Sequence, residues 1–423
     1  MSALPGRKRR ARGNAGFTLV ELMVALTGGL FISLAVFALS RDSGRFYQSE
    51  SRIANATVGG LLGFERLRTD IARAGFLASP NAARDQRLCG LPDSSWPAAL
   101  QNLASIRVTT PVGTYPALAA NGRTPPALVL AGSYASSDLF SAIAYANGSR
   151  IVFRLGNLSP DHPLQPAAMR LGAGAAPTQD AMNSVFRVGG ALRIVQNGRQ
   201  YYGVIQSATG GNDPLVTITN VPPVQQQGGG IGCGLTVPGS AASRSTINVV
   251  NFIRYQLGTP HTVTGLANYQ PLYAASNAGD AAPGEAGRTE LMRVEQDLTG
   301  ADIDGTEEVV AEYAVDFNLQ VTVATPVGCC DSTLAVIPPS SAQFATYTGP
   351  TYGNPNTSPE LIRSVRVRLG VRSREGDRSS TMVNPTGGGL FRFNLGTGNA
   401  DAYARVRTFQ ADVFLHNQAD ILW

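Results

Sequence analysis

Lysine is almost absent from this 423-residue chain, and histidine and cysteine are scarce. Lys8 is the only lysine, so no lysine nucleophile or Schiff base is available beyond residue 8. There are 3 histidines and 4 cysteines, and no Cys-x-x-Cys pair occurs. Because His162, His261 and His416 are also far apart in the chain, a zinc site is not predicted.

Other sequence signals of catalysis are missing as well. Neither Gly-x-Ser-x-Gly nor His-Glu-x-x-His occurs. The glycine-rich stretch 228–234 is not followed by Lys-Ser/Thr and does not match Gly-x-Gly-x-x-Gly, so we predict a flexible loop there rather than a phosphate site. No enzymatic activity and no cofactor are predicted.

Acidic residues are absent from positions 1–16, which contain five basic ones: Arg7, Lys8, Arg9, Arg10 and Arg12. The formal net charge of +5 therefore becomes 5 − 5 = 0 for the rest of the chain. Basic residues beside an apolar span mark its cytoplasmic side. A nucleic-acid partner would require basic residues clustered with aromatics on the remaining chain. The charge thus indicates membrane topology, and nucleic acid is not predicted as a primary partner.

An apolar run from Phe17 to Leu39 follows, long enough to cross a bilayer as a helix. Its one charged residue is Glu21, and a carboxylate at that depth costs about 2.5–3.5 kcal/mol on insertion scales. A cleaved secretory signal with small residues around Ser40 is one interpretation, but the run exceeds the usual apolar region and contains Glu21. A plain membrane anchor leaves Glu21 unexplained.

Residues 13–26 resemble the processing site of type IV prepilins, in which a Gly-Phe junction precedes an apolar run with one glutamate. The resemblance implies that a prepilin peptidase cleaves between Gly16 and Phe17 and that the new amino group of Phe17 is methylated. It also implies an assembly role for Glu21, whose partner would be the Phe17 amine of a neighbouring subunit. A buried ion pair of this kind favours one register of subunits more than it adds stability.

Apolar residues continue at spacings of three and four: Ile53, Ala56, Gly60, Phe64, Leu67, Ile71 and Ala74. This pattern predicts one helix from Phe17 to about Ala74, membrane-embedded first and amphipathic later. The segment 70–76 resembles a signature of PilW-type minor pilins, as do, more weakly, parts of 247–417 that end at Asn417. Asp70 and Arg73 are either a solvated pair on the helix face or packing residues.

From residue 100 onward short β-rich segments predict strands: 106–109, 127–130, 150–153, 201–205, 215–218, 249–253, 309–323, 362–371 and 405–415. The predicted fold class is α+β, with the long N-terminal helix packed on an antiparallel sheet as in pilins and an enlarged β-rich globular part. One face of the last strands is predicted to be buried, with Arg363, Arg366, Arg368 and Arg372 mostly opposite. The segment 156–185 is predicted to be a loop.

The cysteines all follow the apolar run, where disulfides persist if that part of the chain is extracytoplasmic. Four cysteines allow three pairings. We favour Cys89–Cys233, because both lie beside glycines, whereas closing the vicinal pair Cys329-Cys330 would strain the peptide between them.

The acidic stretch 302–308 is predicted to be a turn before a strand. Asp302, Asp304 and Glu307 are weak candidates for a metal site, since the full EF-hand pattern is absent.

Four regions are predicted: a leader 1–16, a transmembrane or filament-core helix 17–40, an amphipathic continuation 41–76, and a β-rich extracytoplasmic domain 77–423. The resemblance implies a minor pilin that crosses the inner membrane once, N-terminus in the cytoplasm, and then joins a pilus. Its partners would be the prepilin peptidase, other minor and major pilins, and the inner-membrane pilus assembly machinery. A type II secretion pseudopilin and a secreted binding module with a signal peptide are the alternatives.

Overall fold

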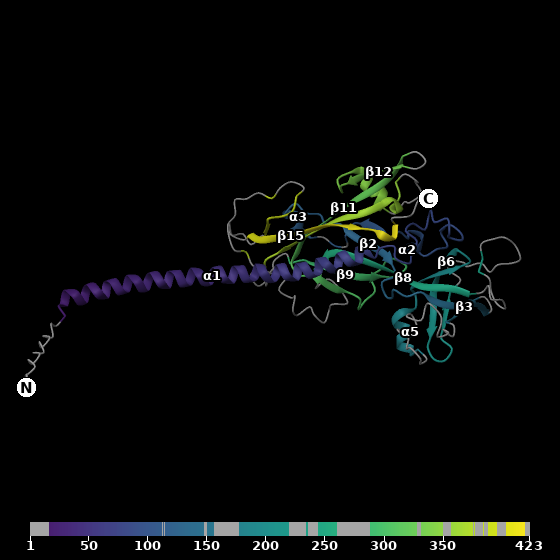
Figure 1. Cartoon of the computed structure of the whole chain (residues 1–423), viewed down its shortest axis with the longest axis horizontal. Helices are drawn as coiled ribbons and strands as arrows, with labels where there is room; N and C mark the ends of the chain where they lie inside the picture. The colour runs from purple at the N-terminus through teal and green to yellow at the C-terminus, as the bar shows by residue number, and fades with distance from the viewer. Residues whose placement is uncertain are drawn as a thin grey trace, which may run out of the picture. The chain divides into compact units, whose positions relative to one another are not determined.

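The structure is a computed structural model of the whole chain (Figure 1). It describes residues 17–111, 113, 115–147, 150–155, 177–219, 234–235, 244–259, 288–327, 331–349, 357–374, 376, 384, 388–395 and 403–418. The chain forms two compact units, Met1–Ala54 and Asn55–Trp423. The leader 1–16 lies outside the described residues.

The helix α1 runs from Leu19 to Ala72, which confirms the predicted helix to within two residues at each end. In the first unit the side chains from Phe17 to Leu39 are exposed. By length and composition α1 can span a membrane. In the second unit one stripe of α1 is buried, and it includes Phe64, Leu67 and Ile71.

Antiparallel strands make up most of the second unit, so the fold is α+β. The strands are β1 (Ile106–Thr109), β2 (Ala127–Gly132), β3 (Phe140–Asn147), β4 (Arg150–Leu155), β5 (Ala191–Gln196), β6 (Arg199–Thr209), β7 (Leu215–Ile218), β8 (Arg244–Gly258), β9 (Glu290–Gln296), β10 (Glu308–Ala311), β11 (Ala314–Val327), β12 (Asp331–Ile337), β13 (Ile362–Arg372), β14 (Arg392–Asn394) and β15 (Tyr403–Phe414). Short helical segments join them: α2 (Ala98–Gln101), α3 (Pro116–Ala120), α5 (Gln179–Val185), α7 (Ala342–Thr348), η5 (Pro359–Leu361) and η6 (His416–Gln418). Every strand predicted from the sequence is present except the one at 309–323, which is divided.

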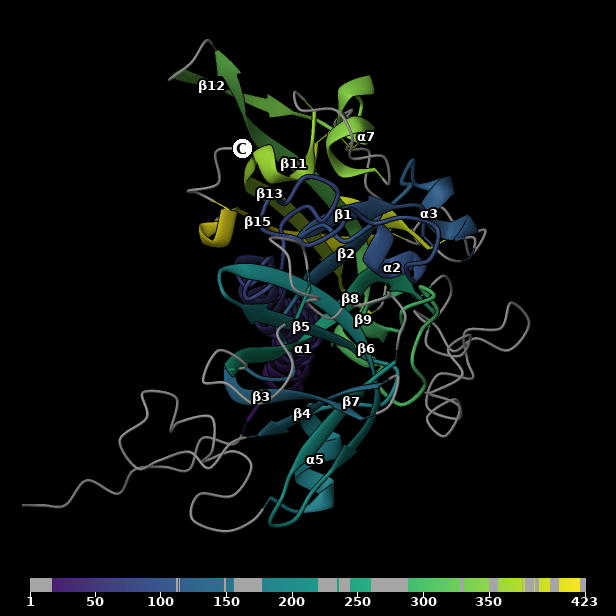
Figure 2. The ribbon, with the colours of Figure 1, turned by 90° about the vertical axis from the view of Figure 1, so that its right-hand side faces the viewer.

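The longest strand, β8, belongs to two structures at once. Its first half, up to Val250, pairs with β3 on one edge and β5 on the other. The chain of pairings β3–β4–β7–β6–β5 then returns to β8, which closes a six-stranded antiparallel barrel. The second half of β8, from Asn251, pairs instead with β2 and β9 in an open sheet. In Figure 2 β8 lies between the barrel strands β3, β4 and β7 and the sheet that contains β11 and β13.

Alternating apolar side chains from all six strands fill the barrel: Phe140, Ala142, Ala144, Ile151, Phe153, Leu155, Leu192, Ile194, Tyr201, Ile205, Ala208, Val216, Ile218, Ile247 and Val249. The helix α5 adds Met182 and Val185 to this core. Its N-cap is Thr178, whose hydroxyl accepts from the Ala181 N–H. The prediction of a loop over 156–185 is therefore wrong for Gln179–Val185, and residues 156–176 lie outside the described residues.

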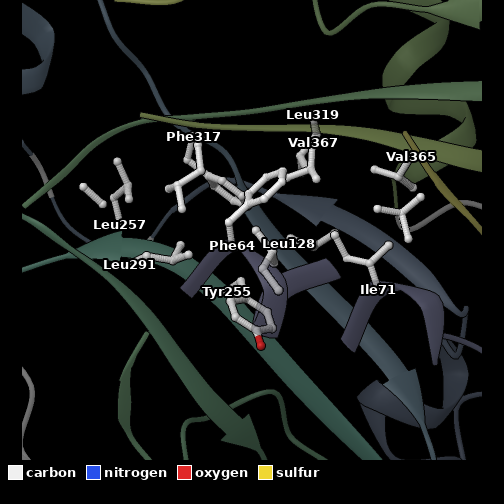
Figure 3. Close-up of a cluster of buried hydrophobic side chains, with 14 of the residues drawn as sticks. Phe64, Ile71, Leu128, Tyr255, Leu257, Leu291, Phe317, Leu319, Val365 and Val367 are labelled. Carbon is white, nitrogen blue, oxygen red and sulfur yellow. The ribbon is translucent and has the colours of Figure 1, made fainter. Parts of the chain in front are cut away.

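A second sheet, in the order β12-β11-β13-β15-β14, covers the open sheet. Its register places Phe317, Leu319 and Val321 of β11 opposite apolar residues of β13. The second-unit part of α1 contributes to the core between the sheets, where Figure 3 shows Phe64 and Ile71 among side chains of both. Burying a side chain of this size contributes about 1.5–3 kcal/mol.

The predicted single strand at 309–323 is wrong. The chain turns between β10 and β11, and Tyr313 there has a φ of 52°. The Tyr313 N–H donates to the buried carboxylate of Glu290 at 2.8 Å, which holds the turn. Burial raises the pKa of Glu290 to about 7, against the opposing effect of Arg288. Alternation of apolar residues cannot reveal an acceptor that lies on another strand.

Arg366, Arg368 and Arg372 alternate with the apolar side chains of β13, as predicted, but the prediction that only one face of the strand is buried is wrong at two of them. Arg366 has 40% of its side-chain surface exposed and is paired with Asp412 at 2.8 Å. Arg368 is buried and donates to Asp316 at 2.9 Å. Arg372 is fully buried, and its guanidinium lies 5.1 Å from the centre of the Tyr313 ring. The second face of this sheet is thus partly covered, and each buried cation has an acceptor or an aromatic partner.

Candidate functional site

The start of α1 is closed by a reciprocal pair of hydrogen bonds between Thr18 and Glu21. The Glu21 N–H donates to Thr18 Oγ1 at 3.2 Å, and the Thr18 N–H donates to Glu21 Oε2 at 3.1 Å. Thr18 Oγ1 also donates to Glu21 Oε2 at 3.0 Å. This is a capping box, with Thr18 at the N-cap and the glutamate three residues later. Glu21, the one charged residue of the apolar run, therefore has a hydrogen-bond partner within its own helical turn.

The capping box fixes where the helix begins. Phe17 precedes the N-cap, is not helical, and has 82% of its surface exposed. The Gly16–Phe17 bond is consequently upstream of the first helical residue, Leu19, although Gly16 itself lies outside the described residues. Glu21 Oε1 makes no hydrogen bond within the described part of the chain, so the carboxylate keeps acceptor capacity.

Asp70, near the other end of α1, is buried rather than solvated. Its Oδ2 accepts from the Tyr255 hydroxyl at 2.8 Å and from Arg293 Nε at 2.9 Å. Its backbone carbonyl accepts from the Tyr134 hydroxyl at 2.8 Å. Arg66 lies 4.0 Å from the same carboxylate. Of the two interpretations of Asp70, a solvated pair on the helix face or a packing residue, the structure supports the second. Asp70 joins the helix to β8 and β9.

Tyr255 remains a hydrogen-bond donor at physiological pH. Burial raises the pKa of its phenol well above the ordinary value, and the adjacent Asp70 carboxylate adds to the rise. Burial likewise raises the pKa of Tyr134, again with Asp70 adding to it. Both phenols therefore donate to Asp70, one to its side chain and one to its backbone.

The segment after Asp70 is held by backbone and side-chain contacts from distant parts of the second unit. Arg73 Nη2 donates to the Ser133 carbonyl at 2.7 Å. Gly75 has a φ of +75°, which few residues except glycine adopt, and its N–H donates to the Ala131 carbonyl at 2.8 Å. The amide of Asn417 donates to the Ala74 carbonyl at 3.1 Å. The two stretches that carry the PilW-type resemblance, 70–76 and the block ending at Asn417, are thus in direct contact.

Cys89 is disulfide-bonded, whereas Cys233, Cys329 and Cys330 lie outside the described residues. Cys89 and Gly234, the residue after Cys233, are hydrogen-bonded to two adjacent residues of β6. The Cys89 N–H donates to the Gln200 carbonyl at 3.0 Å, and the Tyr201 hydroxyl donates to the Gly234 carbonyl at 2.9 Å. The pairing Cys89–Cys233 stays a prediction, and these contacts favour it.

The acidic stretch before β10 does form a turn, and its side chains are engaged within the protein. Asp302 is ion-paired with Arg254 and accepts from Gln296. Glu307 accepts from the Gly305 N–H at 2.7 Å. Among the described residues no group of three His, Cys, Asp or Glu side chains is placed to hold a metal. Asp302, Asp304 and Glu307 are therefore not brought together as a site.

A pocket of about 1020 Å³ lies between the end of β1, α3 and α7. Its walls are mainly proline, threonine and aromatic residues, including Tyr115 and Phe344. Arg123 is the one charged residue lining it, and it is already held by Asp316 at 3.7 Å and by the Gly388 carbonyl. The described lining offers no pair of groups suited to acid–base or nucleophilic chemistry.

The chain matches no protein-family model, no curated protein and no solved structure. Glu21 was predicted as a functional residue from the sequence and Thr18 was not, although Thr-x-x-Glu before an apolar run is a recognisable capping signal. Tyr255 and Arg293 were not predicted either, because no local sequence pattern marks them as partners of Asp70.

Proposed function

We propose that this protein is a type IV pilin-like subunit of the PilW-type minor class, anchored in the inner membrane before it joins a pilus. The observation that carries the proposal is the capping box of Thr18 and Glu21. It begins the helix at Leu19, so Phe17, on the carboxyl side of the Gly16–Phe17 bond, is exposed and not helical. A peptidase needs its scissile bond extended and accessible, so this geometry fits processing at that position.

The processing step belongs to a prepilin peptidase. Hydrolysis of the Gly16–Phe17 amide releases the basic leader as a carboxylate and leaves a free amine on Phe17. Methylation of that amine keeps its positive charge. The mature chain then begins with an apolar residue and a helix able to span the membrane.

Glu21 supplies the assembly contact. A carboxylate accepts up to about four hydrogen bonds, and in the capping box only Oε2 is used. Oε1 is available to the Phe17 amine of a neighbouring subunit, so capping and pairing are compatible. The pair favours one axial register among subunits.

The size of the globular part supports a low-copy role. Most of the 423 residues follow the helix, in a barrel and two sheets, and so large a domain packs poorly as a densely repeated subunit. Membrane partners are then the peptidase, other pilins and the inner-membrane assembly machinery. The globular domain has a structural role, without a cofactor or catalytic activity.

Mass spectrometry of the mature N-terminus tests the proposal. We expect a chain that begins with N-methylated Phe17, and we expect Gly16→Val to block this processing while Gly13→Val leaves it intact. A mature chain that begins at Arg41 would instead identify a secreted binding module. An unprocessed chain would identify a plain anchor. Copurification of methylated chains with pili, rather than with secretion components, separates a pilin from a pseudopilin.

A further inference from the structure

The strand β12 is an exposed edge of the five-stranded sheet. It pairs with β11 over seven residues without a bulge, and it has no partner on its other edge within the described chain. Residues Asp331 to Val336 are all exposed, and only Ile337 is buried. Figure 2 shows β12 at the margin of the second unit. Its outer edge therefore presents unpaired backbone N–H and C=O groups to solvent.

The other edge strands of the two sheets are short, and two of them are packed against helices. β1 and β10 have four residues each, and β14 has three. The helix α7 packs on β1. The Val310 carbonyl of β10 lies against Gly63 of α1. Short and covered edges are the usual protection against pairing with another chain, so β12 is the exception among the described edges.

Two large apolar side chains on β12 face solvent on the same side of the sheet. Leu334 is 69% exposed and Val336 is 53% exposed. Their partners on β11 are Ala324 and Thr322, and the cross-strand row of Thr322 continues through Ser364 to the exposed Phe414. Ser332 to Ile337 contain no charge, no lysine and no proline, which are the residues that usually prevent edge pairing.

We propose that the free edge of β12 binds an extended segment of another polypeptide, which adds a strand to the sheet. An unpaired strand edge is matched by another strand, because backbone donors and acceptors then meet at the regular spacing. A seven-residue segment would extend about 23 Å along the edge. The bound segment would carry no charge where it lies opposite Ser332–Ile337. At alternate positions it would place apolar side chains beside Leu334 and Val336.

A flexible segment fits this edge better than a second copy of the chain. Stable interfaces between folded proteins bury at least about 1,000 Å² in total. A contact confined to two β12 edges would involve only one seven-residue strand from each copy, which is a small patch on which to dock two folded domains. A flexible segment gains backbone hydrogen bonds along the whole edge and can also fold its side chains over the sheet. This surface is separate from the processing site, so its test does not depend on the proposed function.

A fluorescein-labelled seven-residue peptide of alternating valine and threonine is a suitable probe. Added to the full chain in detergent micelles, it is expected to raise fluorescence anisotropy and to slow hydrogen exchange within 331–337. The same peptide with N-methylated amides keeps its side chains but loses its donors, and we expect it to bind at least roughly tenfold more weakly. Equal binding of the two peptides, or protection elsewhere but not in 331–337, would overturn strand addition.

Leu334→Lys places a charge at the free edge and is expected to weaken peptide binding at least roughly tenfold. Because Leu334 is exposed, the variant should keep the wild-type circular dichroism spectrum. Val188→Lys, at a position 62% exposed outside the five-stranded sheet, is the matched control and should bind normally. Sedimentation of the chain without peptide tests the competing occupant. A dimer that Leu334→Lys dissociates would mean that the edge serves self-association, and the proposal would then be wrong.

Discussion

The two ends of α1 are stabilised by residues at very different distances along the chain. At the start, Thr18 and Glu21 are three residues apart. At the end, Asp70 binds Tyr255 across 185 residues, and Asn417 binds the Ala74 carbonyl across 343 residues. The first end needs only its own turn of helix. The second forms only when the β-rich unit has folded around it.

This difference explains what each end can do. A locally capped N-terminus keeps its shape whether or not the globular unit is folded, so under the proposed function the start of the helix would already be formed when processing occurs. The C-terminal end of the helix is fixed to β8 and β9 by a buried carboxylate with two donors. A force applied to that end of the helix would therefore be transmitted to β8 and β9. Substitutions at the two ends should accordingly differ in how much stability they remove and in how much of the chain they affect.

The largest effect is expected for Asp70→Ala. It leaves the Arg293 guanidinium, which has 11% of its side-chain surface exposed, without its closest acceptor. Breaking a buried pair on one side costs about 3–5 kcal/mol, and we expect the lower part of this range because Glu308 lies 3.7 Å from the same guanidinium. Urea unfolding followed by the fluorescence of buried Trp96 measures the loss.

Glu65→Ala is the control for this prediction. Glu65 pairs with Arg68 on the same helix, but both side chains are about half exposed. An exposed pair contributes less than about 1 kcal/mol. Equal destabilisation by the two substitutions would show that Asp70 does not fix the helix end.

A second test compares alanine substitutions at two glycines of α1, Gly59 and Gly63, which lie about one helical turn apart. A Cβ at Gly63 would lie 2.3 Å from the Val310 carbonyl oxygen, and backbone cannot move aside easily. Gly63→Ala is therefore expected to lower the free energy of unfolding, since overpacking costs about 1–3 kcal/mol against a helix-propensity gain of about 1 kcal/mol. Gly59 has no atom within 4 Å of such a Cβ, so Gly59→Ala should stabilise by up to about 1 kcal/mol. Effects of the same sign in urea unfolding would contradict the close approach of α1 to β10.

The sequence of this chain predicts its individual helices and strands better than it predicts which distant strands pair with one another. The apolar stripe and the absence of proline between Phe17 and Phe76 place α1 within two residues of its observed ends. Short β-rich segments likewise locate β1, β7 and β13. Those signals depend on residues a few positions apart, and the same is true of the capping box.

The barrel and the Asp70 contacts could not be predicted in this way. Whether β5 pairs with β8 depends on two segments about 55 residues apart, and no periodicity within either segment records it. The turn at Tyr313 depends on Glu290, which lies 23 residues upstream on another strand. Arg372 follows the polar face of its own strand, yet it is buried because other segments cover that face. In each case the deciding partner is distant in sequence.

The smallest and most local effect is expected for Thr18→Val. Loss of an N-cap side chain costs about 1 kcal/mol, which corresponds to roughly a fivefold larger equilibrium constant for opening the first turn. Amide hydrogen exchange at Glu21 and Leu22, whose N–H groups donate to Thr18, should therefore accelerate, while the urea unfolding of the second unit stays unchanged.

Thr27→Val provides the matched control, because Thr27 Oγ1 donates to the Met23 and Val24 carbonyls inside the helix and caps nothing. If Thr18→Val and Thr27→Val accelerated exchange in the first turn equally, the capping box would not determine where α1 begins. If Thr18→Val also destabilised the second unit, the start of the helix would not be stabilised locally. Faster exchange confined to the first turn would instead show that the N-terminal end of α1 is fixed by the four residues Thr18 to Glu21 alone.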